Sequence, residues 1–136
     1  MTTKEYLSQI RRYDCQISNK LEEIKELRLR ISGTSSFSNG DRVQTSGSKD
    51  QVGSCVSKIV DMEREVDALI DKRLEIVKQI EAISDADMYD VLAKKWILKK
   101  GFKVIGIEMK KSDRQVFNIY ENAMDLFEHT FGHLYL

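Results

Sequence analysis

The 136-residue sequence contains no proline and only seven glycines. Proline breaks helices and shapes loops, so its absence favours long uninterrupted helices. Few windows show the strict two-residue alternation of β-branched residues that strands require. No apolar run is long enough to span a bilayer, and no apolar signal core stands at the N-terminus. The composition therefore predicts an all-α protein without a membrane-spanning segment.

Cysteine is equally scarce, with Cys15 and Cys55 as the only two thiols. Without a secretory signal, we expect a cytoplasmic protein whose thiols stay reduced. In the helical hairpin described below, the two cysteines would lie about 20 Å apart along the axis, which is too far for a disulfide. Both are expected to act as small buried hydrophobic side chains.

The formal net charge is zero, but the charges are not evenly spread. Residues 94–120 carry eight basic side chains against two acidic ones, Glu108 and Asp113. The basic residues are Lys94, Lys95, Lys99, Lys100, Lys103, Lys110, Lys111 and Arg114. A local excess of positive charge is the footprint that phosphate binding needs.

Two long amphipathic patterns occupy the first part of the chain. Apolar residues recur at steps of three and four over residues 3–31 and again over 52–83, which predicts two helices with one apolar stripe each. Neither stripe can be buried alone, so we expect an antiparallel, coiled-coil-like hairpin over residues 1–83 that also associates with a second copy. The Ser/Thr/Gly-rich segment 32–51 is expected to be a flexible loop.

Residues 84–136 are expected to form a second domain. A third helix over 84–98 would begin at Ser84 or Asp85 and stop at Gly101. A short helix over 102–109 follows, and Gly106 in it would let two helix backbones approach closely. After a polar break, Ser112 can cap a last helix that starts at Asp113. This order of elements predicts a three-helix unit with a helix-turn-helix.

The outward side chains at the start of the last helix suit DNA recognition. Arginine, glutamine and asparagine are the side chains that read guanine and adenine edges. The predicted base-contacting residues are Asp113, Arg114, Gln115 and Asn118. The predicted phosphate-contacting residues are Lys103, Lys110, Lys111 and Ser112. The same pattern also fits a solvated helix pair that binds no DNA.

The segment 89–127 resembles the helix-turn-helix of region 4 of bacterial sigma factors. The resemblance rests on Leu92, on Val104-Ile105-Gly106 in place of an "EIA"-like step, on Met109 before the turn, on the Ser112 cap and on Val116. The sequence departs from that family in two places. The usual glutamate is Val104, and the usual turn glycine is Lys110, which would have to take a left-handed conformation.

The stretches "TKEYLSQIRRYDCQISNKLEEI", "GDRVQTSGSKD" and "KIVDMEREVDALIDK" make the whole chain similar to small phage and prophage proteins of Gram-positive bacteria, the ArpU-like and RinA-like transcriptional regulators. This resemblance implies a regulator in the cytoplasm of a bacterial host that binds double-stranded DNA in a sequence-specific manner. It implies neither a particular operator sequence nor whether the protein activates or represses transcription.

A different class of function is left open by the same residues. The chain could be a coiled-coil adaptor that binds RNA polymerase or a phage packaging component without reading DNA. An enzyme is not expected, because no set of nucleophile, base and orienting residue stands out and no phosphate-binding glycine loop occurs. His129 and His133 are four residues apart, but Gly132 weakens that helix, so we expect neither a metal site nor a cofactor.

Overall fold

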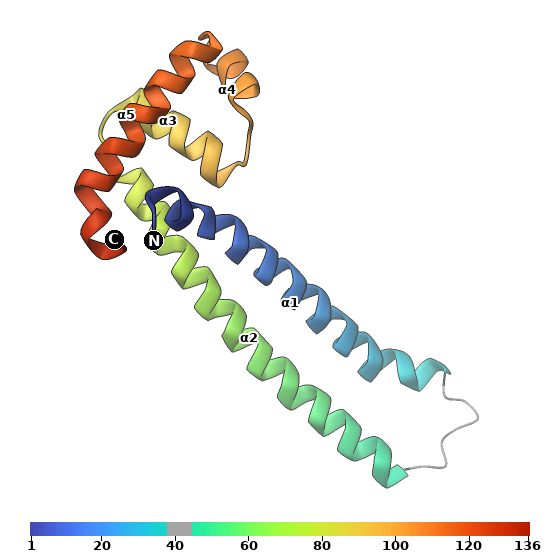
Figure 1. The fold of residues 1–136 in the computed structure, drawn as a ribbon. Helices are drawn as coiled ribbons and strands as arrows, with labels where there is room; N and C mark the ends of the chain where they lie inside the picture. The colour runs from blue at the N-terminus through green and yellow to red at the C-terminus, as the bar shows by residue number, and fades with distance from the viewer. Residues whose placement is uncertain (38–44) are drawn as a thin grey trace. The chain divides into compact units, whose positions relative to one another are not determined.

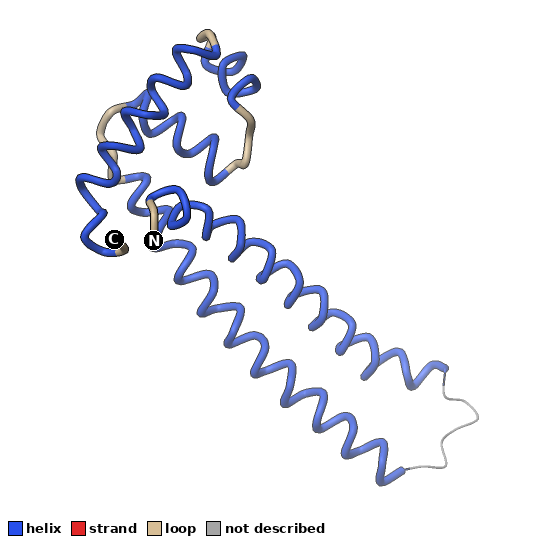
Figure 2. The backbone as a smooth tube through the Cα atoms, viewed as in Figure 1, coloured by secondary structure: helices blue, strands red, loops and turns tan. Residues whose placement is uncertain are grey.

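The protein is all-α, as the sequence predicts. The computed structural model describes the backbone of residues 1–37 and 45–136, and the side chains of residues 1–32 and 52–136. The elements along the chain are α1 (Thr3–Phe37), α2 (Thr45–Glu81), α3 (Ala86–Leu92), the π-helical turn η1 (Ala93–Ile97), α4 (Phe102–Met109), α5 (Asp113–Phe131) and the short 3₁₀ turn η2 (Gly132–Leu134) (Figure 1). Over the described ranges every regular element is a helix, and none is a strand (Figure 2).

The chain forms two compact units, residues 15–71 and residues 1–14 with 72–136. We call the first the hairpin unit and the second the terminal unit. In the hairpin unit, α1 and α2 run antiparallel and side by side (Figure 1), since Lys20 pairs with Glu65 at 2.6 Å and Arg28 with Glu63 at 3.1 Å. Its buried side chains are Ile24, Leu27, Ile59, Met62 and Val66. This confirms the predicted helical hairpin.

Both long helices extend into the segment that was expected to be a loop. α1 continues to Phe37 and α2 already begins at Thr45. Extending an existing helix adds one hydrogen bond for each residue that is fixed, so weak helix formers can follow once the first turns exist. Residues 38–44 of the expected 32–51 loop lie outside the described residues.

The terminal unit has one apolar core, to which α1, α2, α3, α4 and α5 all contribute. Its buried residues are Leu7, Ile10, Ile76, Ile80, Ile83, Val91, Leu92, Ile105, Val116, Tyr120, Ala123 and Phe127. The boundary expected after residue 83 therefore differs from the division in the structure. The reason is that the apolar sides of α3, α4 and α5 are buried together with Leu7, Ile10, Ile76 and Ile80 from α1 and α2.

The C-terminal tail closes this unit against the start of α1. The Tyr6 and Tyr135 rings stack with their centroids 4.2 Å apart, and the Thr3 and Tyr135 hydroxyls form a hydrogen bond of 2.8 Å. Tyr135 of the tail thus packs within the chain, at residues that begin the predicted hairpin, whereas Leu134 and Leu136 remain exposed.

Two expectations about single residues are wrong. Cys15 is exposed, whereas Cys55 is half-buried, and both thiols are free. Cys15 lies two residues from the half-buried Ile17, which turns it to the other side of the helix. Gly101 is not the stop of the third helix, because its backbone is extended and it caps the start of α4. The left-handed residue after η1 is Lys99, with φ of 60°.

Candidate nucleic-acid interface

The turn between α4 and α5 has the geometry that the sequence pattern predicts. Lys110 ends α4 in the left-handed conformation, with φ of 58° and ψ of 45°. The Lys111 N–H donates to the Gly106 carbonyl at 2.8 Å, and the Lys110 N–H donates to the Ile107 carbonyl at 3.3 Å. These bonds satisfy carbonyls that a helix end would otherwise leave unpaired. The departure from glycine at this position is accommodated in the backbone.

Gly106 explains why the two helices can meet so closely. A Cβ atom added to this residue would lie 2.8 Å from the backbone oxygen of Lys111 and 3.7 Å from Val116. The first distance is shorter than a van der Waals contact, and a backbone atom cannot swing away. The expected close approach at Gly106 is therefore confirmed.

The start of α5 is held by a capping box, which involves two of the predicted site residues. The Gln115 N–H donates to the Ser112 hydroxyl at 3.2 Å, and the Ser112 N–H donates to the Gln115 side-chain oxygen at 2.9 Å. The two side chains thus accept hydrogen bonds from backbone N–H groups that the start of a helix would otherwise leave unpaired. Gln115 is therefore occupied at its acceptor atom and keeps only its amide donors for another partner. The Ser-x-x-Gln spacing is the sequence signature from which this role could have been predicted.

Two of the predicted base-contacting residues lie on one exposed face of α5. Arg114 and Asn118 are exposed and four residues apart, which places them one turn above each other. Asp113 is exposed at the first position of the same helix. Neither Arg114 nor Asn118 has an ion pair or side-chain hydrogen bond within the described part of the chain. Their polar groups are therefore available to a ligand.

Phe117 and Glu121 complete this face. The Phe117 side chain is 45% exposed and contacts the edge of Phe102 at a centroid distance of 5.9 Å. Glu121 is exposed one turn beyond Asn118, and its charge opposes any approach of phosphate to the later part of α5. The seven-residue spacing from Arg114 to Glu121 is the sequence signal that places both on one helix face.

The predicted phosphate-contacting lysines fall into two groups. Lys103 and Lys110 are exposed and have no acidic partner among the described side chains. Lys111 is half-buried, and its ammonium lies 3.7 Å from the Asp87 carboxylate. Among these lysines, Lys103 and Lys110 are thus without an acidic partner in the described part of the chain, whereas Lys111 is partly neutralised from α3.

The basic stretch before α4 is neutralised further by acids that are distant in sequence. The Lys100 ammonium contacts both Glu108 oxygens at 2.8 Å, and the Lys99 ammonium lies 2.7 Å from Asp14. The hydrogen bond from Lys100 holds the pKa of Glu108 below its ordinary value. The hydrogen bond to Asp90 raises the pKa of Lys94. The positive charge free to act on a ligand is therefore smaller than the residue count suggests.

Within the ranges that the structure describes, no helix is long and apolar enough to cross a membrane. No family model, no curated protein and no solved structure matches this chain.

Proposed function

We propose that this protein is a phage-type transcriptional regulator that binds double-stranded DNA through α4, the turn and α5. The observation that carries the proposal is the turn, where Gly106, the left-handed Lys110 and the Ser112 cap set two short helices against each other. Such a pair offers the first turns of its second helix to the major groove. Arg114 and Asn118 stand exposed on those turns.

In this proposal the contacts divide by type. Arg114 and Asn118 would read base edges, with Asp113 beside them, and Phe117 is placed to meet a thymine methyl group. Lys103 and Lys110 would contact phosphates from α4 and its C-terminal end. Gln115 and Ser112 keep the helix start in shape and contribute less than the sequence pattern suggested, because their acceptor atoms are used within the capping box.

Self-association through the hairpin unit is the second part of the proposal. α2 carries a stripe of exposed aliphatic side chains beside its buried one, formed by Val52, Val56, Val60 and Ile70. Their spacing places all four on the same side of a straight helix. Exposed aliphatic groups gathered on one side of a helix favour burial against a second copy of the same chain. A dimer would present two reading helices to paired half-sites.

The test of DNA binding is fluorescence anisotropy with a pool of labelled duplexes at two salt concentrations. We expect one preferred duplex, with affinity that falls steeply as salt rises. Arg114→Ala should lose about 1–3 kcal/mol at the preferred duplex only. Lys103→Ala should weaken all duplexes alike and reduce the salt slope by about one. Arg64→Ala removes an exposed arginine from α2 and serves as the matched control.

An adaptor without DNA binding is the second candidate, and one feature of α4 favours it. Ile107 is 73% exposed and Val104 is 45% exposed, and aliphatic side chains on an outer helix face suit a protein partner such as RNA polymerase. Flat anisotropy for the wild type at low salt would reject the DNA proposal and leave this candidate. Sedimentation of wild type against Val56→Lys separately tests the dimer, since the charged variant should sediment as a monomer.

A further inference from the structure

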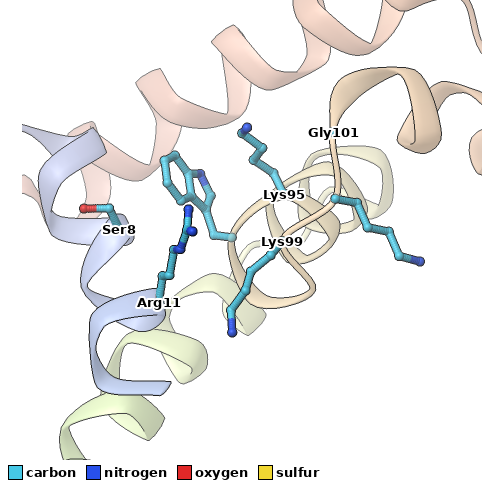
Figure 3. A pocket seen from close by; sticks show the side chains of 7 residues that line it. Ser8, Arg11, Lys95, Lys99 and Gly101 are labelled. Atoms are coloured by element: carbon cyan, nitrogen blue, oxygen red, sulfur yellow. The ribbon is translucent and has the colours of Figure 1, made fainter. Parts of the chain in front are cut away.

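The terminal unit contains a pocket beside the segment that joins α3 to α4. Its volume is about 270 Å³, and its walls include Ser8 and Arg11 from α1 and Lys95, Trp96 and Gly101 from the joining segment. Figure 3 shows Arg11 extending from α1 toward the segment that carries Lys95 and Lys99. Since a water molecule takes about 30 Å³, the pocket can hold a small polyatomic ion together with several waters.

The charged side chains that line the pocket are all cationic. Besides Arg11 and Lys95 they include Lys99 and Lys100, whose ammonium groups are bound to Asp14 and Glu108. Arg11 and Lys95 have no acidic partner in the described part of the chain. The Lys95 ammonium instead lies 4.8 Å from the centroid of the Phe102 ring and 5.8 Å from that of the Trp96 ring. Two cations without an acidic partner thus line one pocket.

An unpaired donor in the pocket wall points to the same kind of ligand. The indole N–H of Trp96 is buried and has no hydrogen-bond partner among the described residues. An indole nitrogen is a donor only, so the partner it lacks is an acceptor. A buried donor without an acceptor is costly.

The backbone around the pocket adds a further positive end. Gly101 caps the start of α4 without a side chain, so the free N–H groups of the first turn keep their partial positive charge. The joining segment also combines the π-helical turn η1 with the left-handed Lys99. π-helical turns occur frequently at functional sites.

We propose that this pocket binds a phosphate group, with Arg11 and Lys95 as its charged ligands. A guanidinium fork and an ammonium from two different elements suit an anion with oxygens on several sides, and arginine in particular matches phosphate oxygens in pairs. The phosphate is either one of the DNA backbone or that of a small phosphate ester. The recognition chemistry is the same for both sources.

The experiment uses the emission of Trp96, because it is the single tryptophan of the chain. The full-length protein is titrated with inorganic phosphate while sodium chloride keeps the ionic strength constant. A saturable change in emission is expected. Arg11→Gln should weaken phosphate binding by at least about tenfold, and Lys95→Gln should act in the same direction.

Arg12→Gln is the matched control, because Arg12 is the next residue of α1, is exposed and does not line the pocket. Its phosphate affinity should equal that of the wild type. Thermal melts by circular dichroism establish that each variant is folded before titration. An unsaturable response of the wild type, or an equal loss in Arg11→Gln and Arg12→Gln, overturns the proposal.

The source of the phosphate is separated by anisotropy with the preferred duplex. If DNA supplies it, Arg11→Gln lowers duplex affinity and the salt slope falls by about one. If a free ester supplies it, duplex affinity stays at the wild-type value while phosphate binding is lost. Both results support the pocket. Because the phosphate titration contains no DNA, a failure of DNA binding would reject the proposed function and leave this proposal standing.

Discussion

A Cβ atom built on Gly106 would lie closer to a neighbouring backbone atom than one built on Gly53 or Gly101. The nearest atom to a Cβ built there is the backbone oxygen of Lys111 at 2.8 Å, whereas a Cβ on Gly53 would meet nothing within 4 Å. Side-chain size at residue 106 therefore decides whether the turn before α5 can form.

Gly106→Ala is expected to lower the free energy of unfolding by about 1–3 kcal/mol, because the new methyl group forces the two backbones apart. Gly53→Ala is the control and should raise it by about 0.5–1 kcal/mol, since alanine is the better helix former. Urea denaturation measures both. A gain in stability for both variants would show that the α4–α5 contact is looser than the structure has it.

Tyr120 makes stability depend on alkaline pH. The residue is 8% exposed, and burial raises the pKa of its phenol. The folded protein therefore holds this proton more tightly than the unfolded chain, whose tyrosines ionise near about pH 10. The stabilising contribution is complete below that pH and is lost as pH rises through the folded pKa.

The free energy of unfolding should thus fall as pH rises above about 10, and Tyr120→Phe should make the fall smaller. Part of the fall remains, because burial also raises the pKa of Tyr6 and of Tyr135. Tyr89→Phe changes an exposed phenol and should leave the curve as it is. Urea denaturation along this pH series measures the effect, and identical curves for wild type and Tyr120→Phe would contradict it.

At the scale of the element, the end of α4 contains local strain. Lys110 occupies the left-handed region that glycine favours, and this conformation costs other residues about 1–2 kcal/mol. The strain is offset by the two hydrogen bonds that close the helix end and leaves a lysine next to the start of α5.

Lys110→Gly should raise the free energy of unfolding by up to about 1 kcal/mol, since the relief of strain exceeds the extra freedom of the unfolded chain. Lys103→Gly removes the same charge from an ordinary helical position and should lower stability by about 1 kcal/mol. Differential scanning calorimetry distinguishes the two signs. A loss of stability in both variants would mean that Lys110 is not strained.

At the scale of the whole molecule, the helix-turn-helix depends on the two ends of the hairpin. Leu7 and Ile10 from α1 and Ile76 and Ile80 from α2 lie in the same core as Val116 and Phe127 of α5. Removing them would expose the apolar sides of three short helices to water.

A fragment of residues 84–136 is therefore expected to lack a cooperative unfolding transition, whereas the full chain should show one. Thermal melts by circular dichroism, together with the dispersion of amide signals in NMR spectra, measure this. A sigmoidal melt and native-like dispersion for the fragment would show that residues 84–136 form an independent domain after all.

The sequence by itself determined the features that depend on local chemistry. Helical periodicity, the Ser112 cap and the small Gly106 follow from neighbouring residues, because capping and backbone preferences act within one or two turns. The left-handed Lys110 was expected from the resemblance to sigma region 4 and not from local preference, which disfavours that conformation for lysine. Even the missed role of Gln115 lay within reach, since the capping box is a local spacing.

Only the tertiary structure decided which charges are free and where the compact units divide. Lys99 meets Asp14 and Lys111 meets Asp87 across long stretches of chain, and no local pattern reports such pairs. The common core of α1, α2, α3, α4 and α5 likewise joins residues that are far apart in the sequence. Apolar burial and ion pairing act between surfaces that folding brings together. Local sequence patterns therefore predict which helix faces are apolar or charged, but not which distant residues contact them.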